Sequence, residues 1–277
     1  MEKVLVTTDL SENSLAGLRF AIQLATQRNL QLIFFHVNDL WEENAFRNPE
    51  QVSMIKQEKI RVQRELEAFV ESAYQSMQAD AGPYQCVCYY DLGIINSILC
   101  YARNNDIHFI CISTHGAGNV LKLLGSNTSE LISESEIPVL CIPKSYQAKP
   151  VESVMFACDM TDHEKELETV VAFAKPISAS VQVLHIVEPD KSGKDHKATE
   201  SAIQEKFGDR VSLVIESGRS DRKLAETVDE AIEKYSPSLL VMFTNQKRNL
   251  LEMLFAPSQA EKYSFRTKIP LLTYTKA

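Results

Sequence analysis

The stretch IHFICISTHGAG, residues 107–118, runs from a short apolar strand into a glycine-containing loop. A second stretch, SLLVMFTNQKR (residues 238–248), repeats the strand but has no glycine after it. Each stretch is followed by an Ile-Pro pair and a further apolar run, which begin at Ile137 and Ile269. The chain is therefore predicted to contain one structural unit twice. Glycines let backbone amides come close to a bound anion, and only the first copy has them.

The rest of the sequence repeats in the same way. Each half opens with a short apolar strand that ends in aspartate, at Asp9 and Asp159, and continues with an apolar stripe at helical spacing. Short apolar strands alternate with helices along both halves, which is typical of a parallel sheet covered on both faces. We therefore predict an α/β fold with two doubly wound, five-stranded parallel-sheet sandwich domains in tandem. These Rossmann-like domains are expected over residues 1–146 and 151–277.

The composition is that of a globular protein. The 277 residues suit two domains, with 44% hydrophobic and 24% charged residues. The formal net charge of −8 disfavours nonspecific binding to nucleic acid or to an anionic membrane. No apolar run is long enough to span a bilayer and the sequence enters a strand pattern directly, so we expect a cytoplasmic protein. The six cysteines have no partners at metal-ligand spacing, which predicts reduced thiols and no metal site.

The ligand site is expected in the first half, beyond the carboxyl ends of the parallel strands. Strand one ends there in Thr7, Thr8 and Asp9, and strand four ends in Ser113. A helix predicted to begin near Ser126 would direct its free amides and the positive end of its dipole to the same edge, where they favour phosphate. The alternative is that the glycines and polar residues serve only as turn and helix-cap residues.

On these motifs, the chain resembles a tandem universal stress protein over both halves. That family has the ATP-binding pattern G-x2-G-x9-G-[ST] after strand four, and residues 113–129, STHGAGNVLKLLGSNTS, match it with two departures. Ser113 stands at the first glycine, and eight residues instead of nine separate Gly116 from Gly125. The resemblance implies ATP or AMP, with or without Mg²⁺, as a ligand of the first domain only. It implies that the nucleotide is held by Thr7, Thr8, Asp9, the backbone of Val37, Ser113, His115, Gly116, Gly118, Gly125, Ser126, Asn127 and Thr128.

The second half lacks this loop. Residues 244–262, TNQKRNLLEMLFAPSQAEK, keep only Ser258 near the expected helix start, so we expect no nucleotide there and a structural or partner-facing role. Strand five of each half begins with Ile-Pro, which suits an edge strand because proline has no amide to donate. In the family such edges pair antiparallel between subunits, so the resemblance implies that the two halves pair within one chain. A homodimer of the whole chain is a further option, and a protein partner is not identified.

Three functions fit this sequence to different degrees. The first is a stress-response regulatory protein that binds ATP or AMP, and the second is a scaffold that acts without nucleotide. The third is an enzyme on a related adenine-nucleotide fold, but the loop TTDLSE (residues 7–12) has no glycine, and His115 has no base or nucleophile partner. We therefore predict no catalytic residue and, at most, slow ATP hydrolysis.

Two features outside the loop carry an expectation of their own. His36 and His185 recur at matching strand ends, which favours a structural role for both. A long, charge-rich helix is predicted over about residues 51–78, a length that the second half does not match. Its simplest interpretation is a solvated face, and the alternative is a surface for a partner.

Overall fold

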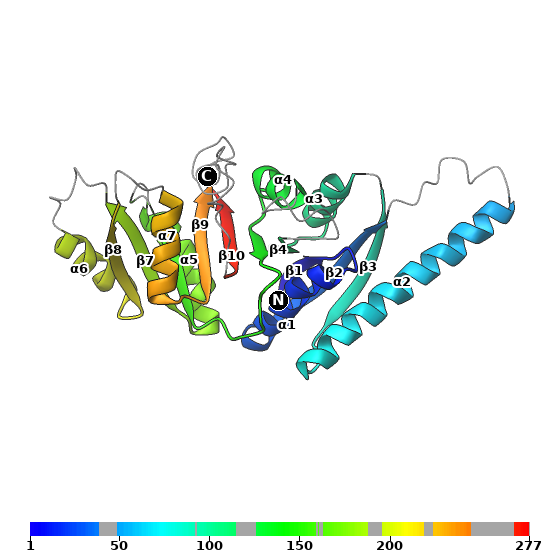
Figure 1. The fold of residues 1–277 in the computed structure, drawn as a ribbon, viewed down its shortest axis with the longest axis horizontal. Coiled ribbons are helices and arrows are strands. Elements are labelled where there is room, and N and C mark those ends of the chain that lie inside the picture. The colour runs from blue at the N-terminus through cyan, green and yellow to red at the C-terminus, as the bar shows by residue number, and fades with distance from the viewer. Residues whose placement is uncertain are drawn as a thin grey trace. The chain divides into compact units, whose positions relative to one another are not determined.

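A computed structural model gives the fold (Figure 1), and it describes residues 1–38, 49–91, 93–114, 126–158, 160, 163–187, 196–218, 224–244 and 269–276. The chain divides into two compact units, Met1–Ala148 and Lys149–Ala277. The division falls in the polar, proline-containing segment that separates the two halves of the sequence repeat.

The first unit has a five-stranded parallel sheet with the strand order β3-β2-β1-β4-β5. Its elements in chain order are β1 (Glu2–Thr7), η1 (Glu12–Ser14), α1 (Leu15–Gln27), β2 (Leu30–Asn38), α2 (Pro49–Met77), β3 (Tyr84–Tyr90), α3 (Ile94–Asn104), β4 (Phe109–Ser113), α4 (Ser126–Glu134) and β5 (Val139–Ile142). Helix α1 contacts α2 and α3 contacts α4, and the two pairs cover opposite faces of the sheet (Figure 1). The predicted doubly wound α/β sandwich is confirmed for this half.

The central strands form the core of the first unit because both of their faces are covered by helices. Leu5 of β1, Phe34 of β2 and Ile110 of β4 have no exposed surface. Leu18 of α1 is likewise fully buried, and it belongs to the apolar stripe that the sequence shows at helical spacing. This core fixes the carboxyl ends of β1, β2 and β4 beside one another.

The second unit repeats the architecture with the strand order β10-β9-β6-β7-β8, again with parallel pairing. Its elements are β6 (Ser153–Cys158), α5 (His163–Ala174), η3 (Lys175–Ile177), β7 (Ser180–Val187), α6 (His196–Phe207), β8 (Val211–Ser217), α7 (Leu224–Tyr235), β9 (Leu239–Thr244) and β10 (Leu271–Thr275). Each of the strands β5 and β10 follows an Ile-Pro pair and lies at one end of the strand order of its own unit. The helix predicted between β9 and β10 lies outside the described residues.

The turn after the first strand of each unit has the same unusual backbone. Leu10 has a φ of 61° and Met160 has a φ of 63°, a left-handed conformation that side chains other than glycine rarely adopt. The amide of Leu10 donates to the hydroxyl of Thr8 at 3.0 Å, and that of Met160 donates to the thiol sulfur of Cys158 at 3.2 Å. The two units therefore share this turn, which a threonine hydroxyl holds in the first unit and a cysteine thiol in the second.

Candidate functional site

The predicted nucleotide site lies at the carboxyl edge of the first unit's sheet. Thr7 and Thr8 stand at the end of β1, Val37 is the penultimate residue of β2, and Ser113 is the last residue of β4. Helix α4 begins at Ser126, as the sequence predicts, and includes the other two polar residues of its first turn. His115, Gly116, Gly118 and Gly125 lie outside the described residues, as do the side chains of Ser126 and Asn127.

The residues after β1 are already hydrogen-bonded to one another. The hydroxyl of Thr7 donates to the carbonyl of Cys111 at 3.3 Å, and that of Thr8 lies 2.7 Å from the hydroxyl of Ser14. Both threonines are buried, with about 8% and 7% of their surface exposed. Their side chains therefore shape the turn rather than project from it.

Asp9 is exposed at the tip of this turn. Its carboxylate accepts from the amide of Ser11 at 3.0 Å and from the hydroxyl of Ser11 at 2.6 Å. The hydroxyl of Ser14, at the beginning of α1, contacts Thr8 and the carbonyl of Ser11. Asp9 thus combines local hydrogen bonds within the turn with an exposed position at the sheet edge.

Val37 offers its backbone at the same edge. In a parallel strand, successive residues point their amide and carbonyl groups to alternate neighbours. Phe35 accepts from the amide of Thr8 on the β1 side at 3.0 Å, and Asn38 accepts from the amide of Asp91 on the β3 side at 3.2 Å. The N–H and C=O of Val37 therefore point to the β1 side. The pairing of β1 with β2 ends at Thr7 and Phe35, two residues before Val37, so this peptide lies beyond the last paired residue.

Ser113 joins the end of β4 to the beginning of α1. Its hydroxyl accepts from the amide of Gly17 at 2.9 Å and donates to the carbonyl of Ser14 at 3.1 Å. The amide of Gly17 lies in the first turn of α1, where helices leave N–H groups without an intrahelical partner. The side chain at the position of the motif's first glycine is thus buried and caps a helix. Sequence reasoning missed Gly17, whose only signal is a glycine inside an otherwise regular helix.

Helix α4 brings its N-terminus to the end of β4. The hydroxyl of Thr128 is buried and lies 3.5 Å from the carbonyl of Ser113. Because Thr128 is in the first turn of α4, this contact places the positive end of the helix dipole at the carboxyl edge of the sheet. An anionic group at this edge would find unpaired helix amides there.

His36 and His185 form hydrogen bonds with carbonyl groups at equivalent positions of the two units. Nδ1 of His36 lies 2.9 Å from the carbonyl oxygen of Thr8, and Nδ1 of His185 lies 3.4 Å from that of Cys158. A carbonyl can only accept, so each Nδ1 carries the donated proton. Each ring therefore ties the second strand of its unit to the end of the first, which confirms the predicted structural role.

The second unit carries a charge pair close to the equivalent edge. Glu166 is buried in the first turn of α5, and its carboxylate lies 3.0 Å from the ammonium nitrogen of Lys276, just after β10. Glu166 precedes the fully buried Leu167 as Gly17 precedes the fully buried Leu18. An acidic side chain thus stands where the first unit has a glycine bonded to Ser113. The loop with Lys247, Arg248 and Ser258 lies outside the described residues, as does Asp159.

In the part of the chain that the structure describes, no three His, Cys, Asp or Glu side chains come together in a way that would hold a metal ion. Within the same residues, no helix combines the length and the apolar character needed to cross a bilayer. Among the described residues, the carboxyl edge of the first unit presents the backbone of Val37, the N-terminus of α4 and the exposed carboxylates of Asp9 and Asp91.

Known proteins of the same fold cover the full chain. A universal stress protein from Archaeoglobus fulgidus is 17% identical, with a TM-score of 0.70 over 99% of this chain and 98% of its own. A protein of unknown function from Pseudomonas aeruginosa is 14% identical, with a TM-score of 0.61 over 99% and 92% of the two chains. Curated protein sequences include no significant match. A sequence profile of the universal stress protein family matches residues 1–143, which is more than half of the 277 residues, so the chain belongs to the universal stress protein family.

Proposed function

We propose that the first unit binds an adenine nucleotide, ATP or AMP, and that the chain acts as a stress-response regulator rather than an enzyme. The observation that carries this proposal is the peptide of Val37, which points its N–H and C=O past the end of β1. Adenine presents an acceptor nitrogen next to the N6 amino donor, which matches one donor and one acceptor from the same residue. Membership of the universal stress protein family supports the same ligand.

Recognition in this proposal relies on backbone groups. The hydroxyls of Thr7, Thr8, Ser113 and Thr128 are all used inside the protein. The ribose would then be held by the exposed Asp9, and the phosphates by the N-terminus of α4 with the glycines that precede it. The bound nucleotide would act as a signal if its occupancy favours one arrangement of the loop after β4 over another.

The second unit is proposed to be structural or partner-facing. The segment after β9 has none of the glycines that bring amides close to phosphate. This absence of glycines favours nucleotide binding in the first unit alone.

The test is a calorimetric titration of the full chain with ATP and, separately, AMP. Val37→Pro removes the N–H that would read adenine, and it spares the bonds to β3, because those come from Asn38 and other alternate residues. Val37→Ala keeps the N–H and is the side-chain control. Ile186→Pro is the matched control in the second unit. Ile186 precedes Val187, whose carbonyl accepts from the amide of Gly218, just as Val37 precedes Asn38, whose carbonyl accepts from the amide of Asp91. Circular dichroism checks that each variant folds.

We expect one site per chain, lost in Val37→Pro and retained in Val37→Ala and Ile186→Pro. Loss of binding in Ile186→Pro alone would move the site to the second unit and contradict the proposal. If millimolar nucleotide produces no heat of binding, the alternative, a scaffold that acts without nucleotide, is favoured. The internal hydrogen bonds of the Thr7, Thr8, Ser113 and Thr128 hydroxyls are consistent with that alternative. Phosphate release measured in the same samples is expected to stay near the background rate.

A further inference from the structure

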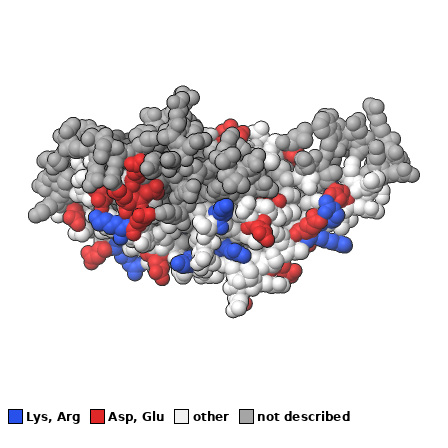
Figure 2. Space-filling view, viewed as in Figure 1, with Lys and Arg blue, Asp and Glu red and all other residues white. Residues whose placement is uncertain are grey.

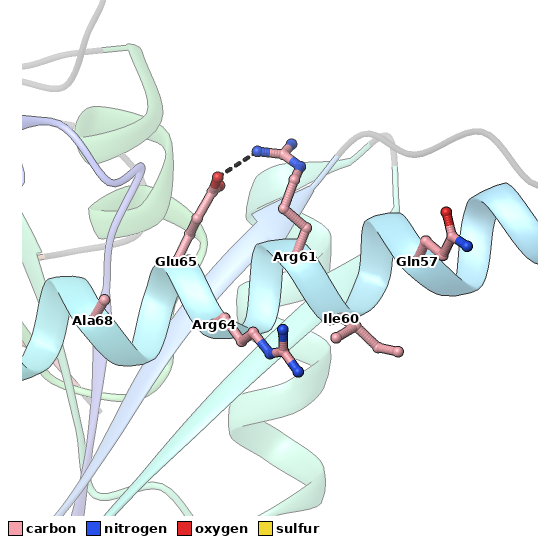
Figure 3. Close-up of a pocket in the computed structure, with 6 residues that line it drawn as sticks. All are labelled: Gln57, Ile60, Arg61, Arg64, Glu65 and Ala68. Atoms are coloured by element: carbon pink, nitrogen blue, oxygen red, sulfur yellow. Dashed lines mark hydrogen bonds and ion pairs between the residues drawn. The ribbon is translucent and has the colours of Figure 1, made fainter.

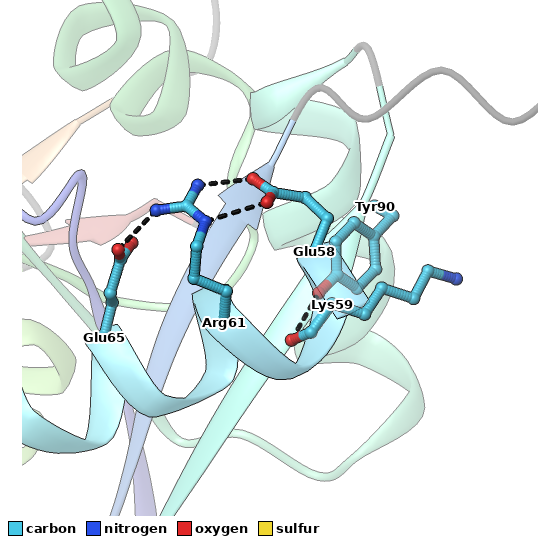
Figure 4. Close-up of polar contacts among 5 residues, drawn as sticks. All are labelled: Glu58, Lys59, Arg61, Glu65 and Tyr90. Carbon is cyan, nitrogen blue, oxygen red and sulfur yellow. Dashed lines mark hydrogen bonds and ion pairs between the residues drawn. The ribbon is translucent and has the colours of Figure 1, made fainter. Parts of the chain in front are cut away.

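Helix α2 is far longer than is needed to cover the sheet of the first unit. It has 29 residues, against 12 in α6, its counterpart in the second unit. At 1.5 Å per residue it is about 43 Å long. The hydroxyl of Tyr90, at the end of β3, lies 3.4 Å from the carbonyl of Lys59, and the Lys59 ammonium lies 4.7 Å from the ring centre (Figure 4). Residues before Lys59 therefore extend past the sheet, as Figure 1 shows.

The two faces of α2 differ. The inner face is apolar and buried, with Val62, Leu66 and Val70 at most 2% exposed. The outer face has a shallow depression of about 460 Å³, lined by Gln57, Ile60, Arg61, Arg64, Glu65 and Ala68 (Figure 3). Ile60 is 53% exposed and Met54 is 68% exposed, so apolar surface remains uncovered on this side. A polar helix with a purely solvating outer face would not need these two side chains.

The charged groups on the outer face are partly paired within the helix. Nε of Arg61 donates to Glu58 at 2.8 Å, and the same guanidinium bonds Glu65 on its other side (Figure 4). These bonds lower the pKa of the Glu58 carboxyl, because Arg61 donates to its ionised form. Arg64 points away from this cluster (Figure 3), and no acidic side chain of the described residues pairs with it. Arg64 is thus a cation available for a partner.

The charges also separate along the helix. Four basic and two acidic residues lie between Pro49 and Arg64, whereas three acidic and no basic residues lie between Glu65 and Met77. Figure 2 shows basic and acidic side chains gathered along this region. This order opposes the helix dipole, which favours acidic residues near the N-terminus and basic residues near the C-terminus. The separation of charge along α2 is therefore not explained by the helix dipole.

We propose that α2 pairs antiparallel with α2 of a second copy of this chain. Antiparallel pairing about a two-fold axis brings the basic half of each helix against the acidic half of the other, twice in one interface. The outer positions 54, 57, 61, 64, 68, 71 and 75 follow the alternating three- and four-residue spacing at which two helices pack side by side. Arg61 and Arg64 then face Glu71 of the second copy.

A charge-swap experiment tests this pairing in the full chain by sedimentation equilibrium. Arg64 and Glu71 are seven residues apart, about 10.5 Å along the helix, so they do not contact each other in one chain. Arg64→Glu and Glu71→Arg should each raise the dimer dissociation constant about tenfold or more, because each places like charges across the interface. The double variant Arg64→Glu/Glu71→Arg should restore the dissociation constant to near the wild-type value. Both side chains are exposed, and circular dichroism confirms folding.

Three results would overturn the proposal. One is a mass of 31.2 kDa, a single chain, up to millimolar protein in low salt. A second is a dimer whose dissociation constant neither single reversal changes, which would assign self-association to another surface such as a sheet edge. A dimer weakened by each single change and not restored by the double variant would likewise contradict the antiparallel pairing. The test uses no nucleotide, so its result is independent of the proposed function.

Discussion

The hydroxyl of Ser113 accepts a 2.9 Å hydrogen bond from the amide of Gly17, which lies 96 residues earlier in the sequence. The bond joins the end of β4 to the first turn of α1 under the predicted nucleotide site. A Cβ added to Gly17 would lie 3.0 Å from the Ser113 hydroxyl and 3.4 Å from its backbone nitrogen. The serine at the motif's first position and the glycine inside α1 therefore depend on each other.

Replacing Gly17 by alanine is expected to lower the free energy of unfolding by about 1–3 kcal/mol, because the added methyl group crowds Ser113. In a Ser113→Gly background the same change should cost much less, since alanine is the better helix former by about 1 kcal/mol. Urea denaturation of the four proteins gives the coupling energy.

The control for this cycle is Gly82→Ala, where a Cβ would meet nothing within 4 Å. We expect that variant to stay within about 0.5 kcal/mol of the wild type. If Gly17→Ala costs no more than Gly82→Ala, the close approach to Ser113 is not a constraint.

Replacing His36 by leucine should destabilise the chain by about 1 kcal/mol, because the carbonyl of Thr8 loses its donor. Asparagine at position 36 can present an amide donor in place of Nδ1 and should recover part of the loss. His185→Leu should cost less, as its contact to Cys158 is longer, 3.4 Å against 2.9 Å. Equal losses in the two leucine variants would contradict the ranking.

Glu216 should give the second unit a pH-dependent stability. Lys234 Nζ at 2.7 Å and the Tyr235 hydroxyl at 2.8 Å donate to its carboxylate and hold its pKa below the ordinary value of 4.5. An ionised group with a lowered pKa stabilises the fold above its unfolded pKa, and this contribution disappears as the pH falls through the folded pKa. Glu216→Gln should therefore cost up to about 1 kcal/mol at pH 7, and less below pH ~4. A difference that persists unchanged at pH 3 would rule out the ionic origin.

Five of the six thiols should react with iodoacetamide in a fixed order at pH 8. Cys100 is exposed and should be alkylated first, whereas burial raises the pKa of Cys88 to about 11 and that of Cys86 to about 12, which leaves few reactive thiolates. Cys111 and Cys141 are buried and should react only on unfolding. Mass spectrometry follows each site, and Cys100→Ser should remove the fastest phase. Early labelling of Cys111 would contradict the packing of β4.

The fold was predictable because each strand is a short apolar run and each half repeats the other, so one pattern appears twice. The site was predictable only in position. The sequence alone does not distinguish a Ser113 hydroxyl that binds a ligand from one that caps a helix. In the structure it caps a helix, because the amide of Gly17, 96 residues away in the sequence, donates to it. The pair of Glu166 with Lys276 joins residues 110 positions apart, which no local pattern reveals. The family profile, too, matches only residues 1–143, although the second unit has the same fold.

The left-handed residues Leu10 and Met160 bear on how the chain arose. Each costs about 1–2 kcal/mol relative to an ordinary conformation, and glycine at either position would remove that cost. The recurrence of this turn, together with the repeated order of strands and helices, supports an origin of the two halves by duplication of one gene segment. The two copies have since diverged after their fourth strand, where only the first half has glycines in the following loop.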